Sequence, residues 1–76
     1  MMAKITEQTF ELKKEHTYIQ LNNLLQVLQI AQTGGHAKLI IQNGDVMLNG
    51  IIETRVRKKL IPGNVVLVGN QSITII

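Results

Sequence analysis

Hydrophobic and polar residues follow a helical repeat in the stretch from residue 18 to residue 28. Its apolar positions lie three or four residues apart, at Ile19, Leu21, Leu24, Leu25 and Leu28. The intervening positions carry uncharged amides, at Gln20, Asn22, Asn23 and Gln26. A spacing of three and four residues places the apolar side chains along one face of a helix. The pattern therefore predicts a helix over 18–28 that buries one face.

A second helix is expected after Thr33 and should run to about Asn43. Thr33 can accept a hydrogen bond from the free backbone N–H groups at a helix start, and Gly44 can adopt the left-handed conformation that ends many helices. The stretch between them carries apolar residues that supply a packing surface, Ala37, Leu39, Ile40 and Ile41. Because the connecting loop is short, we expect the two helices to pack as a pair.

Strand signals lie on both sides of the helices. Residues 4–12 alternate weakly with a period of two, which fits an edge strand or an extended arm. Residues 46–48 and 51–52 flank Asn49 and Gly50, a dipeptide that tolerates the positive φ angles of a type I′ turn. The sequence therefore predicts a β-hairpin over 46–52.

A further turn is expected at 61–64, where Pro62 and Gly63 favour a reversal of the chain. Two strands should follow it, at 65–68 and 72–76. The chain thus reads as a strand or arm, two helices and then several strands.

This order predicts the α+β class. We expect two short packed helices against a small twisted, mostly antiparallel sheet of about four to five short strands. At 76 residues the chain is expected to form a single domain over 1–76, with an N-terminal strand or arm at 1–16.

Composition fits a folded domain in a reducing compartment. Hydrophobic residues make up 45% of the chain and charged residues 17%, which is typical of globular proteins. Because there is no cysteine, disulfides and cysteine zinc sites are excluded, and aliphatic residues must form the core. The N-terminal residues lack the continuous apolar stretch of a signal peptide or membrane span, so we expect a cytoplasmic protein with no membrane partner.

The net charge of +3 is unevenly distributed along the chain. Over residues 1–16, three lysines face three glutamates. From residue 17 onward, five cations face only Asp45 and Glu53, so this part carries the whole surplus. These cations are Lys38, Arg55, Arg57, Lys58 and Lys59. Positive charge concentrated in this way indicates a polyanionic partner.

Four of the eight Lys and Arg residues fall between positions 55 and 59. If this segment is extended, Arg55, Arg57 and Lys59 share one side of it and Lys58 lies on the other. A basic run can also be a solvated face, or a guard against unwanted strand pairing. Adjacent like charges are costly, and Glu53 is the one acid close in sequence, so we favour a phosphate-binding role.

A second anion contact is expected where the second helix starts. Backbone N–H groups over 34–37 point outward at a helix start and favour an anion, with Lys38 one turn further on. The stretch lacks the glycine spacing and the Ser or Thr of a phosphate loop, which argues against a nucleotide site.

The residue inventory argues against catalysis and against a metal site. Nucleophilic catalysis needs a Ser, Thr or Cys beside an oriented base, and acid–base catalysis needs paired titratable groups. His16 and His36 lie twenty residues apart and, without cysteine, supply too few metal ligands. We therefore expect no enzymatic activity, no cofactor, no metal and no small-molecule substrate.

Phe10 and Tyr18 are the only aromatic residues, and neither is expected in the basic region. Proteins that bind single strands stack the bases on aromatic rings. Because no aromatic ring is expected in the basic region, binding of a single strand is not favoured. A folded or double-helical RNA, recognised through backbone and shape, fits better. DNA binding through the same phosphate contacts stays open. The alternative is a small protein interaction module that uses the basic strip and the edge strands to bind an acidic protein partner.

Five short sequence elements occur in a characteristic order: LNNLL at 21–25, TGGHAK at 33–38, NGDV at 43–46, VMLNG at 46–50 and KLIPGN at 59–64. In this order and spacing they resemble the S-four-type RNA-binding domain, also called the alpha-L motif, over residues 19–68. The elements GGHAK and ETRVRKKL are similar to a small stand-alone bacterial subgroup, the YaaA/YbcJ-like proteins.

The resemblance implies two helices packed on a small twisted sheet and an RNA-binding core over 19–68. It implies a non-enzymatic module that binds structured RNA, ribosomal or otherwise folded, along a basic groove. Lys38 would contact phosphate from the second helix, with the basic run on the far side of the groove. The RNA-binding residues implied in this way are Lys38, Arg55, Arg57, Lys58, Lys59, His36, Asn22 and Asn23.

The chain departs from the family pattern on the first helix. Larger family members usually carry Arg or Lys on its exposed face, whereas this chain has Gln20, Asn22 and Asn23. Amides can hydrogen-bond to sugar or phosphate but exert no long-range attraction. We therefore expect modest affinity and an additional partner, such as a ribosomal surface.

Overall fold

The computed structural model describes residues 4–76. Their helices and strands follow in the order β1 (Thr6–Phe10), β2 (Ile19–Gln20), α1 (Leu21–Val27), α2 (Gly34–Gln42), β3 (Val46–Leu48), β4 (Ile51–Ile52), β5 (Lys59–Leu60), β6 (Val65–Val68) and β7 (Gln71–Ile75). The first three residues of the expected N-terminal strand or arm lie outside the described part.

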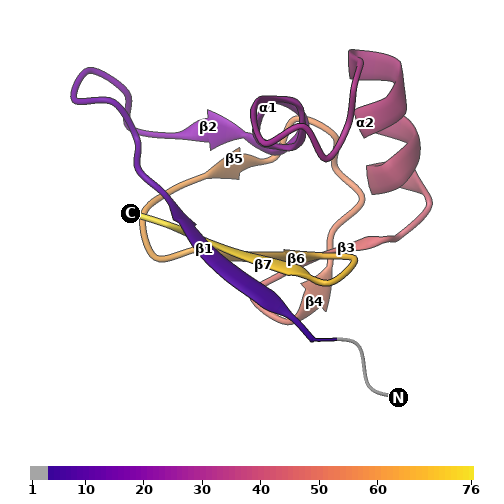
Figure 1. The fold of residues 1–76 in the computed structure, drawn as a ribbon. Coiled ribbons are helices and arrows are strands. Elements are labelled where there is room, and N and C mark those ends of the chain that lie inside the picture. Colours follow the sequence, from indigo (N-terminus) through magenta and orange to yellow (C-terminus); the bar gives the residue numbers. More distant parts are fainter. Residues whose placement is uncertain (1–3) are drawn as a thin grey trace.

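Five strands form one sheet in the order β1-β7-β6-β3-β4. Neighbouring strands are antiparallel except β1 and β7, which run parallel with Thr6 opposite Gln71 and Phe10 opposite Ile75. β2 and β5 form a separate two-stranded antiparallel sheet. Both helices and this small sheet lie on one side of the five-stranded sheet (Figure 1). The α+β class and the mostly antiparallel sheet are confirmed, but the second sheet is an addition to the predicted fold.

The hydrophobic core fills the space between the helices and the sheet. Leu21, Leu24 and Leu25 of α1 are fully buried, as the helical spacing predicts. On α2, Ala37 and Ile41 lie four residues apart and face the same core. The sheet and the loops contribute the remaining buried apolar residues, Ala31, Val46, Leu60, Val66, Val68, Ile73 and Ile75.

The helix α1 begins later than its apolar spacing predicts. Ile19, expected on the buried face of this helix, lies instead in β2, opposite Leu60 of β5. The helix begins at Leu21 and ends at Val27, so Leu28 follows it. The strand pairing with a distant segment overrides the helical pattern at its first positions.

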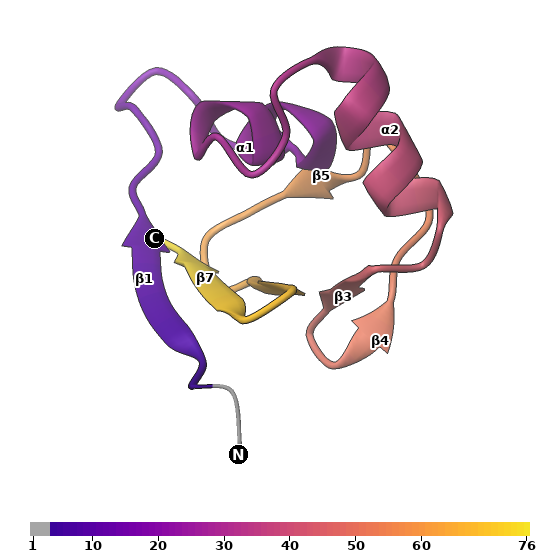
Figure 2. The same cartoon turned by 45° about the vertical axis from the view of Figure 1, so that its right-hand side comes forward.

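The predicted start and end of α2 are confirmed. The Thr33 hydroxyl accepts a hydrogen bond from the His36 backbone N–H at 3.0 Å, and Gly44 beyond the helix has a φ of 82°. Figure 2 shows α1 and α2 side by side above the sheet. Within residues 4–76 no helix combines the length and the apolar character needed to cross a membrane.

The predicted hairpin and the C-terminal strands are also confirmed. Asn49 and Gly50 have φ angles of 52° and 85°, and the Asn49 side chain accepts a hydrogen bond from the Val65 backbone N–H at 2.8 Å. Asn49 therefore ties the hairpin turn to β6. The strand expected at 72–76 starts one residue earlier, at Gln71.

Between β4 and β5 the chain is anchored by a buried carboxylate. Glu53 is only 8% exposed, and both of its oxygens accept hydrogen bonds from the Arg55 guanidinium, from Nε and from an Nη atom, at 2.9 Å each. The Arg55 backbone N–H donates to the same side chain at 3.0 Å. The side-chain hydrogen bonds from Arg55 lower the pKa of Glu53 to about 2, and they outweigh the effect of burial, which raises it.

This pKa predicts a stability contribution that is lost in acid. Because the pKa of folded Glu53 lies below the ordinary value of 4.5, the pair stabilises fully above about pH 4.5 and loses its effect as the pH falls toward 2. We expect Glu53→Gln to lower the free energy of unfolding at pH 7 by about 1–2 kcal/mol, since the exposed guanidinium is screened by water. Denaturant titrations at pH 7 and pH 3 measure the difference.

Glu7→Gln supplies the matched control, because it removes the same charge from an exposed position on β1. The difference in the free energy of unfolding between wild type and Glu53→Gln should be smaller at pH 3 than at pH 7. The difference between wild type and Glu7→Gln should be small at both pH values. Equal unfolding free energies for all three proteins at pH 7 would contradict a stabilising role of the pair.

Candidate nucleic-acid interface

The basic segment, residues 55–59, is held on the N-terminal end of α1 by backbone hydrogen bonds. The Leu21 N–H donates to the Lys58 carbonyl at 2.8 Å, and the Asn22 N–H donates to the Val56 carbonyl at 3.1 Å. The first N–H groups of a helix have no partner within the helix, and here the basic segment satisfies two of them. The next residue, Lys59, pairs with Gln20 across β5 and β2. The backbone of the basic segment is therefore fixed along the start of α1.

These bonds give the basic segment a turn where the sequence predicts an extended strand. The Lys58 N–H donates to the Arg55 carbonyl at 3.2 Å, and the chain reverses at Val56 and Arg57. The prediction of one extended segment is therefore wrong, and strand alternation cannot place Arg55, Arg57 and Lys59 on one side. The physical reason is that the helix N–H groups attract the carbonyls of residues 56 and 58.

The four cations of the basic segment differ in their partners. Arg55 is engaged by Glu53, which confirms that Glu53 is the acid that relieves the run of positive charge. No other ion pair forms within residues 4–76, so Arg57, Lys58 and Lys59 keep their charge uncompensated by a contacting carboxylate. Arg57 and Lys59 are exposed, and Lys58 is half-buried. Three charges remain free to attract an anion.

The residues expected on the second helix occupy its exposed surface. Lys38 and His36 are both exposed on α2, the helix that packs against α1. His36 Nδ1 accepts a hydrogen bond from the Gln32 backbone N–H at 3.2 Å, so Nε2 is the ring atom left to face a ligand. No hydrogen bond or ion pair joins Lys38 or His36 to the basic segment in the described structure.

The two asparagines of α1 have different surroundings. Asn23 is exposed, whereas Asn22 is half-buried beneath the basic segment. The side-chain oxygen of Asn22 is buried and has no hydrogen-bond partner, so this atom is not available to a ligand. Of the two, Asn23 is the residue placed for external contact.

Tyr18 lies beside the basic segment, and the expectation that no aromatic ring does so is wrong. The Lys59 ammonium sits 4.8 Å from the centroid of the Tyr18 ring, within the range of a cation–π contact. The pairing of β2 with β5 brings them together. The sequence does not indicate this contact, because the helical spacing predicts that residues 18–20 belong to the first helix and not to a strand that pairs with the basic segment.

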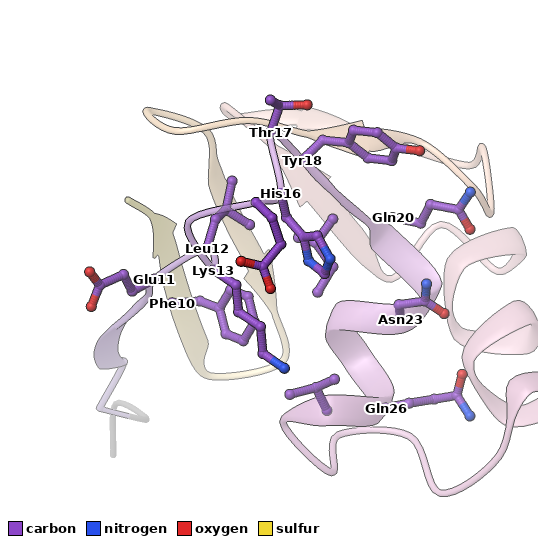
Figure 3. A pocket seen from close by; sticks show the side chains of 13 residues that line it. Phe10, Glu11, Leu12, Lys13, His16, Thr17, Tyr18, Gln20, Asn23 and Gln26 are labelled. Carbon is purple, nitrogen blue, oxygen red and sulfur yellow. The ribbon is translucent and has the colours of Figure 1, made fainter.

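A hollow opens between residues 10–20 and α1 (Figure 3). We call it the arm hollow; its volume is about 930 Å³. It is lined by Phe10, Glu11, Leu12, Lys13, Glu15, His16, Thr17, Tyr18, Ile19, Gln20, Asn23, Gln26 and Val27. Nowhere in residues 4–76 do three or more potential metal ligands gather as a metal site requires. No sequence pattern indicates this hollow, because it is formed by tertiary packing of residues 10–20 against α1.

Comparison with known proteins finds relatives of similar length. The chain is 34% identical over 68 residues to the Escherichia coli K12 protein named "Putative RNA-binding protein YbcJ", covering 90% of this chain and 96% of that protein. The same values hold for "Uncharacterized protein YbcJ" of Shigella flexneri. The solution structure of Escherichia coli YbcJ, described as revealing an alpha-L motif involved in RNA binding, superimposes with a TM-score of 0.67 at 32% identity. It matches all of this chain and 92% of that one.

The family comparison covers the same elements. The model of the S4 domain matches residues 10–76, which include both helices, the basic segment and every strand after β1. The match confirms the resemblance drawn from the five sequence elements over 19–68 and extends it to the end of the chain. The chain belongs to the S4 domain family.

Proposed function

We propose that this chain is a non-enzymatic RNA-binding module that holds folded RNA by its phosphates along the basic segment. The observation that carries the proposal is that three cations without carboxylate partners, Arg57, Lys58 and Lys59, stand on a backbone fixed to the start of α1. Family membership and the name of the Escherichia coli relative support the choice of RNA. The target would be ribosomal or another folded RNA, met in the cytoplasm.

Fixation of the backbone is what turns a basic run into a binding surface. A flexible run must lose conformational freedom when it binds, and that cost reduces affinity. Here the bonds to α1 have already removed much of this freedom, so phosphate contacts cost less to form. Arg55 contributes less than its neighbours, because its guanidinium already serves Glu53.

Lys38 completes the proposed groove from the side of α2. Its exposed ammonium, the outward Nε2 of His36 and the exposed amide of Asn23 would add contacts to phosphate and sugar. Amides add no long-range attraction, so affinity should depend mainly on the lysines and on Arg57. An additional ribosomal contact would then strengthen binding inside the cell.

Salt dependence tests the phosphate contacts. With about four to five phosphates neutralised, log affinity should fall with log salt at a slope of about −3 to −4.5. In Arg57→Gln plus Lys59→Gln the slope should become shallower by about 1.4–1.8, since each contact contributes about 0.7–0.9. Fluorescence anisotropy of a labelled RNA duplex across a range of salt concentrations measures both slopes.

Lys4→Gln plus Lys14→Gln is the matched control, because it removes the same net charge from exposed residues of the N-terminal part. Its slope should stay close to that of wild type. If the two double variants lose affinity equally, net charge alone attracts the RNA and the basic segment is not the binding surface. Equal affinity for a DNA duplex of matched length would widen the proposed ligand to both nucleic acids.

Lys38→Gln tests whether the groove includes α2. We expect its slope of log affinity against log salt to be shallower than that of wild type by about 0.7–0.9. In a triple variant this reduction in slope should add to the reduction caused by Arg57→Gln plus Lys59→Gln. The measurement is the same anisotropy titration. An unchanged slope would remove α2 from the interface and leave the basic segment alone.

A second candidate function is supported by the edge strand β4. Ile51 and Ile52 are 74% and 58% exposed on this edge, which suits the addition of a strand from an acidic protein partner. A pull-down with and without complete nuclease digestion separates the two functions. A protein that stays bound after digestion and is lost in a variant with Ile52→Lys would favour this candidate.

A further inference from the structure

The arm hollow adjoins the basic segment through a single side chain, Tyr18. Its ring lines the hollow and also contacts the Lys59 ammonium, although Lys59 itself does not line the hollow. Tyr18 as a whole residue is 39% exposed, and it is therefore accessible to a ligand. In Figure 3 the Tyr18 ring lies along the rim of the hollow, and His16 and Lys13 extend into it. A group stacked on this ring would lie next to any phosphate held by Lys59.

Two carboxylates and one ammonium line the hollow, which distinguishes it from the basic segment. Glu11 and Glu15 line it together with Lys13 and His16, so it holds no surplus of positive charge for a phosphate. Glu11 points away from the hollow in Figure 3, but its carboxylate still lowers the local potential. An uncharged group is therefore the ligand that fits.

One wall of the hollow is formed by α1 and by Gln20, the residue before this helix, and three side-chain amides line that wall. Gln20, Asn23 and Gln26 each carry a donor and an acceptor, and Figure 3 shows them one above another beside the open space. Amides of this kind match the donors and acceptors on the edge of a nucleobase, and an aromatic ring offers a surface for its face. The volume of about 930 Å³ is within the range of sites for small molecules, ~300–1,000 Å³.

We infer that Tyr18 and the arm hollow bind an unpaired nucleobase whose phosphate is held by Lys59. This inference rests on the proposed function and names the class of RNA more closely. The ligand is a folded RNA in which an unpaired nucleotide adjoins a helix, as in an overhang or a bulge. The helix contacts the basic segment, the unpaired base stacks on Tyr18, and the amides of Gln20 and Asn23 read its edge.

The experiment compares three RNA ligands with one stem. The first is a blunt duplex, the second carries a three-nucleotide single-stranded extension, and the third carries an extension of three abasic nucleotides. The abasic extension adds the same phosphates without bases. We expect the second ligand to bind at least about five times more tightly than the others, because stacking of one base on an aromatic ring contributes ~1–3 kcal/mol. Extensions are placed at the 5′ and the 3′ end in turn.

Tyr18 also supplies a spectroscopic readout, because the chain contains one tyrosine and no tryptophan. A base stacked on the ring should quench its fluorescence, whereas the blunt and abasic ligands should leave it nearly unchanged. In Tyr18→Leu the ligand with the extension should bind no more tightly than the blunt duplex, so the gain from the extension is lost. Tyr18→Phe, which keeps the aromatic face, should retain the gain.

Each other outcome overturns the inference. Equal affinity of wild type for the three ligands, with unchanged fluorescence, would leave the proposed function intact and reject the base site. Equal weakening of all three ligands by Tyr18→Leu would show that the ring acts only by positioning Lys59. If no ligand binds at all, the proposed function fails and the base site with it. Should Tyr18→Leu fail to fold, the fluorescence and the affinities of wild type with the three ligands decide the question alone.

Discussion

Backbone hydrogen bonds at the start of α1 fix the shape of the basic segment. The first two N–H groups of this helix bond to the carbonyls of Val56 and Lys58, and β2, immediately before the helix, pairs with β5. One short stretch of backbone thus satisfies helix donors, extends a small sheet and carries three cations that have no contacting carboxylate within residues 4–76. Without these bonds the helix donors would lack protein partners and the basic segment would lose its fixed shape.

The arrangement of charge follows from the same constraint. A tight turn crowds like charges, and this is tolerable because Glu53 is buried directly beneath it and bonds to Arg55. The bond keeps the carboxylate ionised despite its burial, with a pKa of about 2. One cation is thereby used to anchor the turn, while Arg57, Lys58 and Lys59 remain without contacting carboxylates. Within this segment Arg55 holds the turn in place, whereas the three other cations keep the charge that attracts an anion.

The segment between β1 and α1 reaches the basic segment, although its own formal charges sum to zero. Because β1 pairs in parallel with the C-terminal strand β7, the chain must leave the edge of the sheet and pass beside α1 before it reaches β2. That path encloses the arm hollow and delivers Tyr18 to Lys59. A segment whose formal charges sum to zero thus places an aromatic ring next to a positively charged surface.

The sequence by itself determined the elements whose signals are local. The spacing of Leu21, Leu24 and Leu25, the cap at Thr33 and the turn at Asn49 and Gly50 depend on residues within a few positions of one another. The order of sequence elements also identified the family. Only the tertiary structure decided where α1 begins, how residues 55–59 turn, and which ring stands beside Lys59. Each of these depends on partners that are far apart in the chain, and such pairings leave no periodic trace in either segment alone.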